Sequence, residues 1–374
     1  MVARTHVVVE ANQLDQLIQA LARRGYDAIG PTVRDGAMVL DHLDSARDLP
    51  AGWTAEQGPA HYRLQPLPRP AFFAYAGGPQ SWKKYLHPAD VCLYAAERQN
   101  GAFHILNNDA KPERPYAFLG VKACELSAIK IQDRVLMGDK YRDPVYEARR
   151  KQTFIVAKQC TKSGPTCFCA SMGTGPEVKD GFDLVLTEFA FDGQHRFVVG
   201  IGSERGEEVL SELHTAPASR EDLQKIQAGI ASASEQERKI DTAGLKDLLY
   251  ANFEQPRWSK VAERCLTCGN CTMVCPTCFC TTVEDSTDIT GRAERLRRWD
   301  SCFSINFSYI HGGSIRTSAS ARYRQWLTHK FAAWIDQFGT AGCVGCGRCI
   351  VWCPAGIDVT EEIRALQEKQ HGNS

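Results

Sequence analysis

The sequence lacks an excess of charge of either sign, and it lacks long hydrophobic runs. Lysine and arginine together number 44, as do aspartate and glutamate, so the formal net charge of the 374 residues is zero. A neutral balance gives no electrostatic basis for binding nucleic acid or an anionic membrane surface. The first ten residues show neither an apolar stretch nor a signal-cleavage pattern. We therefore expect a cytoplasmic protein without a membrane anchor.

A glycine-rich fingerprint for dinucleotide binding is also absent. The segment from Gly200 to Gly206 misses the G-x-G-x-x-G spacing by one residue, and Pro217 follows where a continuous βαβ unit would be required. We interpret this segment as a turn. Hydride chemistry is therefore expected on a partner chain.

Cysteine, by contrast, is abundant. The sequence contains 16 cysteines, and because the cytosol keeps thiols reduced, they indicate metal ligation and not disulfides. Two runs near the C-terminus have the spacing C-x2-C-x2-C-x3-C-P, which is typical of bacterial ferredoxins with [4Fe-4S] clusters. The runs are Cys265, Cys268, Cys271, Cys275 and Cys343, Cys346, Cys349, Cys353.

This spacing predicts crossed ligands. Three thiolates on one loop bind one cluster, and the fourth cysteine, which precedes proline, binds the other cluster. The expected sets are Cys265, Cys268, Cys271 with Cys353, and Cys343, Cys346, Cys349 with Cys275. Paired C-x2-C spacings also suit structural zinc. Zinc explains two proline-closed runs of four cysteines poorly.

Four upstream cysteines form a further candidate group. Cys124 follows a predicted strand at the start of a predicted helix, where free backbone N–H groups stabilise a thiolate. Cys160, Cys167 and Cys169 lie at a strand end and in a loop rich in glycine and proline. The spacing suits a third cluster, but from spacing alone packed, buried thiols are an equal alternative.

Four cysteines are left. Cys278, Cys280 and Cys302 lie close to the first run or between the two runs, and we favour packed thiols that shield a cluster. The alternative is redox chemistry toward sulfur substrates, which requires an exposed thiolate of low pKa. Cys92, in an apolar run, is expected to be a packed thiol.

Hydrophobic periodicity predicts an α+β fold. Short apolar runs at residues 116–121 and 154–157 predict strands, and leucines at helical spacing after residue 14 predict a helix. A capping-box pattern at Ser219 and Asp222 predicts another helix start. The expected domains are an α/β domain with the third cluster site (1–217), a helical linker (218–256) and an α-helical two-cluster ferredoxin domain (257–374).

The 67 residues between Cys275 and Cys343 are too many for a compact ferredoxin. Large apolar residues recur at intervals of three and four from Tyr323 to Phe338, which predicts an amphipathic helix. We therefore expect a ferredoxin domain of the α-helical kind. The arginines within residues 292–298 are expected on a solvated helix face, with docking to an acidic partner as the alternative.

Together these motifs resemble a known family. The residues that carry the resemblance are Gly120-Val-Lys-Ala-Cys-Glu-Leu126, Cys160, the segment from Cys167 to Pro176, the two C-terminal runs with the extension of the first to Cys280, Arg298-Trp-Asp-Ser-Cys302 and Tyr323-Arg-Gln-Trp-Leu-Thr-His-Lys330. They are similar to the β subunit of cytoplasmic NiFe hydrogenases of the sulfhydrogenase type, and also to the A subunit of anaerobic sulfite reductase. The resemblance covers about residues 115–365.

The resemblance implies that Cys124, Cys160, Cys167 and Cys169 bind a third [4Fe-4S] cluster. It implies a non-catalytic subunit that relays electrons between a diaphorase-type subunit, which binds FAD and NAD(P), and the small and large subunits of a NiFe hydrogenase. Alternatives are electron supply to a sulfite reductase, or sulfur and polysulfide reduction at the extra cysteines. One departure is that Lys122-Ala-Cys124-Glu125 replaces an expected Arg-Pro-Cys-Asp, which changes the charges near the cluster.

Overall fold

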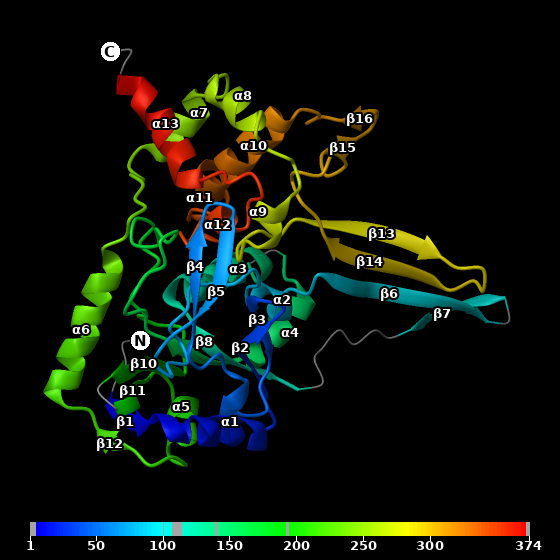
Figure 1. The fold of residues 1–374 in the computed structure, drawn as a ribbon. Helices are drawn as coiled ribbons and strands as arrows, with labels where there is room; N and C mark the ends of the chain where they lie inside the picture. The colour runs from blue at the N-terminus through cyan, green and yellow to red at the C-terminus, as the bar shows by residue number, and fades with distance from the viewer. Residues whose placement is uncertain (1–4, 100, 107–113, 139–140, 192–193, 372–374) are drawn as a thin grey trace.

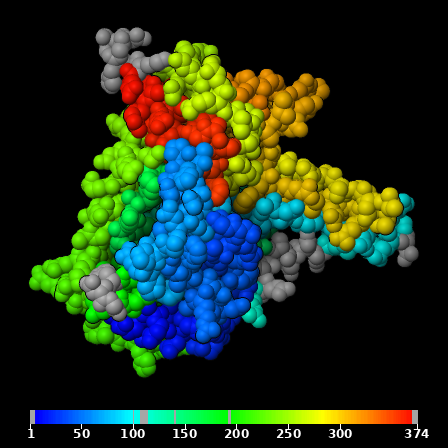
Figure 2. Space-filling view, viewed as in Figure 1, coloured from blue at the N-terminus to red at the C-terminus, as the bar shows by residue number. Residues whose placement is uncertain are grey.

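The computed structural model describes residues 5–99, 101–106, 114–138, 141–191 and 194–371. Figure 1 shows a body built on a β-sheet, a group of helices at the opposite end that includes the C-terminal helix, and an arm of strands. The arm projects well beyond the rest of the surface in Figure 2.

The body contains an eight-stranded sheet with the order β12-β1-β11-β10-β9-β8-β2-β3. The four strands β10, β9, β8 and β2 are parallel, and antiparallel strands extend the sheet on both sides. The strands are β1 (His6–Glu10), β2 (Asp27–Arg34), β3 (Ala37–His42), β8 (Tyr116–Val121), β9 (Phe154–Lys158), β10 (Leu184–Phe191), β11 (Gln194–Ile201) and β12 (Ala216–Pro217). The predicted mixed α/β organisation is confirmed.

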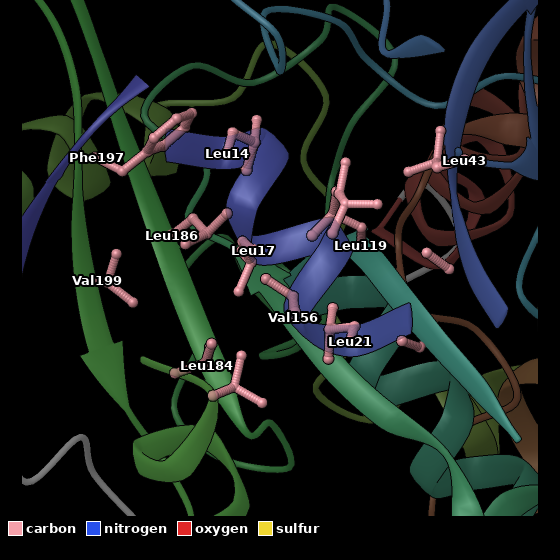
Figure 3. Close-up of a cluster of buried hydrophobic side chains, with 14 of the residues drawn as sticks. Leu14, Leu17, Leu21, Leu43, Leu119, Val156, Leu184, Leu186, Phe197 and Val199 are labelled. Atoms are coloured by element: carbon pink, nitrogen blue, oxygen red, sulfur yellow. The ribbon is translucent and has the colours of Figure 1, made fainter. Parts of the chain in front are cut away.

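Helices cover both faces of this sheet. The body also contains η1 (Ala11–Gln13), α1 (Leu14–Arg23), η2 (Ala46–Asp48), the hairpin β4 (Trp53–Gly58) and β5 (His61–Pro66), α2 (Lys83–Leu86), α3 (Ala123–Leu136), α4 (Pro144–Gln152) and α5 (Glu204–Leu210). Because side chains alternate along a strand, Leu119 and Val156 pack toward α1 (Figure 3). Their neighbours Phe118 and Ile155 pack in a second core with α3 and α4.

The second half of the chain is mostly helical. Its helices are α6 (Arg220–Ser234), α7 (Leu245–Ala251), α8 (Arg257–Ala262), α9 (Asn270–Met273), α10 (Ala319–Thr328), a π-helical turn (His329–Ala333), α11 (Trp334–Phe338), α12 (Arg348–Val351) and α13 (Val359–His371). Most of these helices surround a separate core, whereas α6 packs on β10 and β11 of the sheet. The capping box predicted at Ser219 and Asp222 starts α6 and is confirmed. Helices α7, α8, α10 and α13 share the core through residues such as Leu249, Trp258 and Leu327.

The arm corrects one part of the sequence interpretation. Its strands are β13 (Thr281–Thr287), β14 (Ala293–Trp299), β6 (Asp90–Gln99) and β7 (Ala102–Leu106), in that order across the sheet. The segment between the two cysteine runs is therefore not wholly helical, and it also contains the two-residue strands β15 (Tyr309–Ile310) and β16 (Gly313–Ser314).

The arginines of the arm lie on or next to β14, so the expected helix face is wrong. Cross-strand pairing explains their spacing, because opposite charges face each other on adjacent strands. Arg295 binds Asp285 at 2.6 Å, and Arg298 binds Asp90 and Glu284. Arg295 and Arg298 are thus partnered within the arm, whereas Arg297 pairs with Asp143, the residue that caps α4 in the body.

Candidate iron-sulfur centres

The first centre consists of Cys265, Cys268, Cys271 and Cys353. These four thiols line one cavity, so the fourth cysteine of the second run joins three of the first. Phe303, Tyr323 and Trp326 form apolar walls. The backbone N–H of Ile357 donates to Cys353 Sγ at 3.4 Å. Cys268 is exposed to solvent, whereas the other three thiols are half-buried.

The second centre consists of Cys343, Cys346, Cys349 and Cys275. They line a second cavity, whose walls include Trp326, Phe331 and Val344. Cys275 is buried, and the backbone N–H of Gly345 donates to Cys343 Sγ at 3.5 Å. The structure therefore brings together both predicted sets of four, in the crossed arrangement.

A glycine in each run allows the third cysteine to turn inward. Gly269 and Gly347 follow the second cysteine of their runs and have φ values of 77° and 73°. This left-handed conformation costs glycine little, whereas a Cβ atom disfavours it. Each glycine starts a short helix, α9 or α12, on which the third cysteine lies.

The spacing of the thiols favours clusters over zinc. In a tetrahedral zinc site the metal–sulfur distance is about 2.3 Å, which brings the sulfur atoms to within roughly 4 Å of one another. Four thiols around a cavity fit a larger group such as a cubane cluster.

The third candidate centre is the predicted group of Cys124, Cys160, Cys167 and Cys169. Cys124 lies in the first turn of α3, after β8, and Cys160 follows β9, so the ends of two parallel strands bring them to one edge of the sheet. A Cβ atom on Gly175 would lie 3.1 Å from Cys169 Sγ and 3.6 Å from the backbone nitrogen of Cys124. Gln236 donates to Cys169 Sγ at 3.2 Å.

Burial controls the protonation of the third centre. Burial is the main cause of the raised thiol pKa values, and together with the charge of Cys160 it raises the pKa of Cys167 to about 11 and that of Cys169 to about 12. Metal ligation requires thiolates, so cluster binding at neutral pH must release protons from these groups.

The second and third centres share a wall of backbone. The amide of Phe168 donates to the carbonyl of Gly345 at 2.8 Å, and Thr174 Oγ1 donates to the carbonyl of Val344 at 2.7 Å. A Cβ atom on Gly345 would lie 2.5 Å from the nitrogen of Cys169, so only glycine fits. Cys349, in turn, borders both the first and the second cavity. The three centres therefore follow one another in the order third, second, first.

Lys330 is a buried cation at the second centre. Its Nζ lies 3.2 Å from Cys275 Sγ, 3.2 Å from Thr277 Oγ1 and 2.9 Å from the carbonyl of Gly342. Burial lowers the pKa of Lys330, but the charges of nearby cysteines, Cys275 first, outweigh it and raise the pKa well above its usual value. The lysine lies in the π-helical turn, a feature that is frequent at functional sites.

Arg348 and Glu125 form a buried ion pair between the second and third centres. Glu125 also accepts hydrogen bonds from the backbone of Lys122 and from Trp82 Nε1, both at 3.0 Å. Burial raises the pKa of Glu125, but the charges of Lys122 and Arg348 outweigh it and lower the pKa to about 2. The glutamate that departs from the family pattern is thus a fixed anion beside Cys124.

Sequence reasoning assigned no role to Lys330 or Arg348, although Lys330 ends one of the segments that carry the resemblance. Lys330 lies three residues after Leu327 and four after Trp326, on the apolar side of its helix. A lysine at a core position was therefore an available signal. For Arg348, which follows the glycine of its own run, the sequence gives no comparable signal.

The extra cysteines are mostly paired with each other or with a centre. Cys278 hydrogen-bonds to Cys275, and Cys302 hydrogen-bonds to Cys280. The hydrogen bond from Cys302 lowers the pKa of Cys280. Cys92 lies on β6 in the arm and is half-buried, so it is less enclosed than expected for a packed thiol.

Comparison with known proteins agrees with the sequence and the geometry. A family model of the 4Fe-4S dicluster domain matches residues 264–357. The sulfhydrogenase 2 subunit beta of Pyrococcus furiosus is 37% identical over 263 residues, which cover 69% of this chain and 75% of that protein.

A solved structure of a serine palmitoyltransferase from S. paucimobilis, with a bound PLP–myriocin aldimine, aligns with a TM-score of 0.16 and 11% identity. The alignment covers 57% of this chain and 56% of that one, and the score is too low to support an argument. In the part of the chain that the structure describes, no helix is long and apolar enough to cross a membrane.

Replacing Lys330 by methionine is expected to lower the reduction potential of a cluster in the second centre. Reduction adds negative charge, and a charged N–H···S hydrogen bond stabilises the reduced form more than the oxidised form. We expect a decrease of about 60 mV, which corresponds to a tenfold change in the equilibrium constant of a one-electron couple. An EPR-monitored redox titration measures it. Lys260→Met, at an exposed position on α8, is the control, and equal potentials in the two variants would contradict this role.

Proposed function

The chain belongs to the sulfhydrogenase β-subunit family, and from that premise we propose that it relays single electrons through three [4Fe-4S] clusters. We propose further that it does so between a FAD- and NAD(P)-binding subunit and the small and large subunits of a NiFe hydrogenase. An electron-transfer role follows from the family and from the dicluster domain. When bound, such clusters accept and release one electron at a time.

The observation that carries this proposal is the succession of three four-thiol centres. We assign Cys265, Cys268, Cys271 and Cys353 to one cluster, and Cys343, Cys346, Cys349 and Cys275 to the next, because each set lines one cavity. Cys124, Cys160, Cys167 and Cys169 are assigned to the third. The domains that hold them are proposed as residues 1–217 and 257–374, joined by 218–256.

Buried cations support the presence of anionic clusters. Lys330 contacts a sulfur atom of the second centre, and Arg348 lies between the second and third centres. An isolated buried charge is costly, so buried cations are expected to have partners. Arg348 has Glu125, whereas no carboxylate pairs with Lys330 among the described residues, and thiolate ligands supply its missing negative charge.

The first centre is the proposed point of electron exchange with a partner protein. Cys268 is exposed, and the adjacent Leu266 is 65% exposed although it is apolar. An exposed ligand next to an exposed apolar side chain is suited to docking by another redox subunit. The relative from Pyrococcus furiosus is the β subunit of a sulfhydrogenase, which supports a partner from a hydrogenase complex.

The number of clusters is directly testable. After anaerobic reconstitution we expect the chain to bind about twelve iron and twelve sulfide ions, four of each per cluster. Cys160→Ser should remove about four irons and the EPR signal of one cluster. Cys92→Ser is the control and should retain all iron. Iron for one cluster or fewer in the unchanged chain would refute the relay, and unchanged iron in Cys160→Ser would refute the third centre.

The crossed assignment makes a separate prediction. Cys353→Ser should damage the cluster bound by Cys265, Cys268 and Cys271, although the substitution lies in the second run. Cys275→Ser is the matched variant and should damage the other cluster. EPR of both variants after reconstitution distinguishes the two clusters. An intact first cluster in Cys353→Ser, with loss confined to the Cys343 run, would show that each run binds its own cluster.

A second candidate function is the reduction of sulfur or polysulfide. The contact between Cys280 and Cys302, with the lowered pKa of Cys280, favours it because a thiolate is the reactive form. Replacing both cysteines by serine should then reduce sulfide production at least tenfold while iron content is retained. Cys92→Ser is again the control. Undiminished sulfide production in the double variant would eliminate this function. A subunit that feeds a sulfite reductase shares the relay and differs in its partner.

A further inference from the structure

A large cleft lies beside the third centre and is used by none of the functions above. Its volume is about 600 Å³, within the range of about 300–1,000 Å³ that is usual for small-molecule sites. Strand β4, the segment 67–76, the loop 161–165 and helix α6 form its walls. Figure 1 shows α6 standing along the outer side of the body.

The cleft has the position expected of a ligand site in an open α/β sheet. Such ligands bind beyond the carboxyl ends of the parallel strands. Lys158 is the last residue of β9, and Phe189 and Ala190 lie near the end of the parallel strand β10, and all three line the cleft.

The cleft and the third centre are separated by one glycine. Gly164 lines the cleft, and a Cβ atom on it would lie 3.6 Å from Cys167 Sγ. The same Cβ atom would lie 2.8 Å from the Cβ atom of Ala76, so residue 164 has no room for a side chain. A small molecule bound in the cleft would therefore contact the loop that carries Cys167, a predicted ligand of the third cluster.

The walls combine aromatic surface with positive charge. Phe73, Tyr75 and Phe189 supply rings, which are packed into the wall with at most 9% of each residue exposed. The buried Lys158 donates to the carbonyl of Phe73 at 2.5 Å and lies 5.1 Å from the ring of Tyr75. Three further cations line the cleft, namely Arg69, Lys162 and Lys225, of which Lys225 pairs with Glu221 on α6 at 2.7 Å.

The cleft is lined by fewer carboxylates than cations, and one of these carboxylates already accepts several hydrogen bonds. Glu188 accepts hydrogen bonds from the backbone of Phe72 and Phe73 at 2.6 and 2.8 Å, and from His195 at 2.8 Å. Glu56 is the other carboxylate of the lining. Aromatic walls with excess positive charge suit a planar ring that carries an anionic group.

We propose that the cleft binds a flavin with a phosphate group, of the flavin mononucleotide class, which exchanges electrons with the third centre. The proposal rests on the relay proposed above, because it identifies the electron carrier next to the third cluster of that relay. In each of two steps the ring gains one electron and one proton from solvent while the third cluster is oxidised by one electron. A nicotinamide is unsuited, because it transfers a hydride and a cluster accepts single electrons.

The test is a fluorescence titration of the full reconstituted chain with flavin mononucleotide, and with riboflavin as the ligand that lacks phosphate. We expect flavin mononucleotide to bind at least tenfold more tightly than riboflavin. Ala228→Trp on α6 would fill the cleft and should raise the Kd about tenfold. Ala231→Trp is the matched control, because Ala231 is exposed on the same helix and does not line the cleft.

EPR and iron content separate this proposal from the relay. Flavin mononucleotide should shift the EPR spectrum of the third cluster and leave the other two unchanged. No binding by a chain that holds three clusters, or equal binding by both tryptophan variants, overturns the cleft proposal and leaves the relay intact. If the unchanged, reconstituted chain binds flavin mononucleotide but holds no third cluster, the electron exchange has no cluster to act on. The three-cluster relay is then refuted as well.

Discussion

The contact between the loop of the second cysteine run and the loop that carries Cys167 and Cys169 is the constraint on which the rest depends. Two glycines make it possible: Gly345 approaches the backbone of Phe168 and Cys169, and Gly347 approaches Thr166. A direct backbone hydrogen bond joins the loops. Because any side chain at Gly345 would separate them, the spacing between the α/β body and the helical part is fixed by backbone atoms and not by flexible side chains.

Charge compensation follows from this close approach. Three groups of four thiols lie near each other, and all of these thiols except Cys268 are buried or half-buried. Thiolates so arranged repel one another unless cations offset them. Lys330 and Arg348 provide that charge from helices of the C-terminal part, and Lys122 and Lys158 provide it at the carboxyl ends of β8 and β9. Each of these cations lies on or next to an element whose other buried residues are mostly apolar. These positions therefore contribute both to packing and to charge compensation.

Much of the site was predictable because covalent spacing dictates it. A C-x2-C-x2-C-x3-C-P run has few geometric solutions, and the strand–turn–helix pattern around Cys124 follows from local periodicity. Lys330 was missed because a single lysine on an apolar face is usually assigned to solvent. The arm was missed because β14 pairs with β6, nearly 200 residues earlier. Its polar alternation resembles a solvated helix face until the partner strand is known.

That long-range pairing also orders events in time. When the ribosome has made β6 and β7, the strand that covers β6 does not yet exist, and the hairpin presents an open edge of unpaired backbone groups. β14 arrives only after the first cysteine run has been synthesised. Of the sheets that begin in the N-terminal half, the sheet of the arm is therefore completed last. Until then the nascent chain exposes a strand edge that can pair with other strands. Closing it couples maturation of the N-terminal body to the synthesis of the iron-binding half.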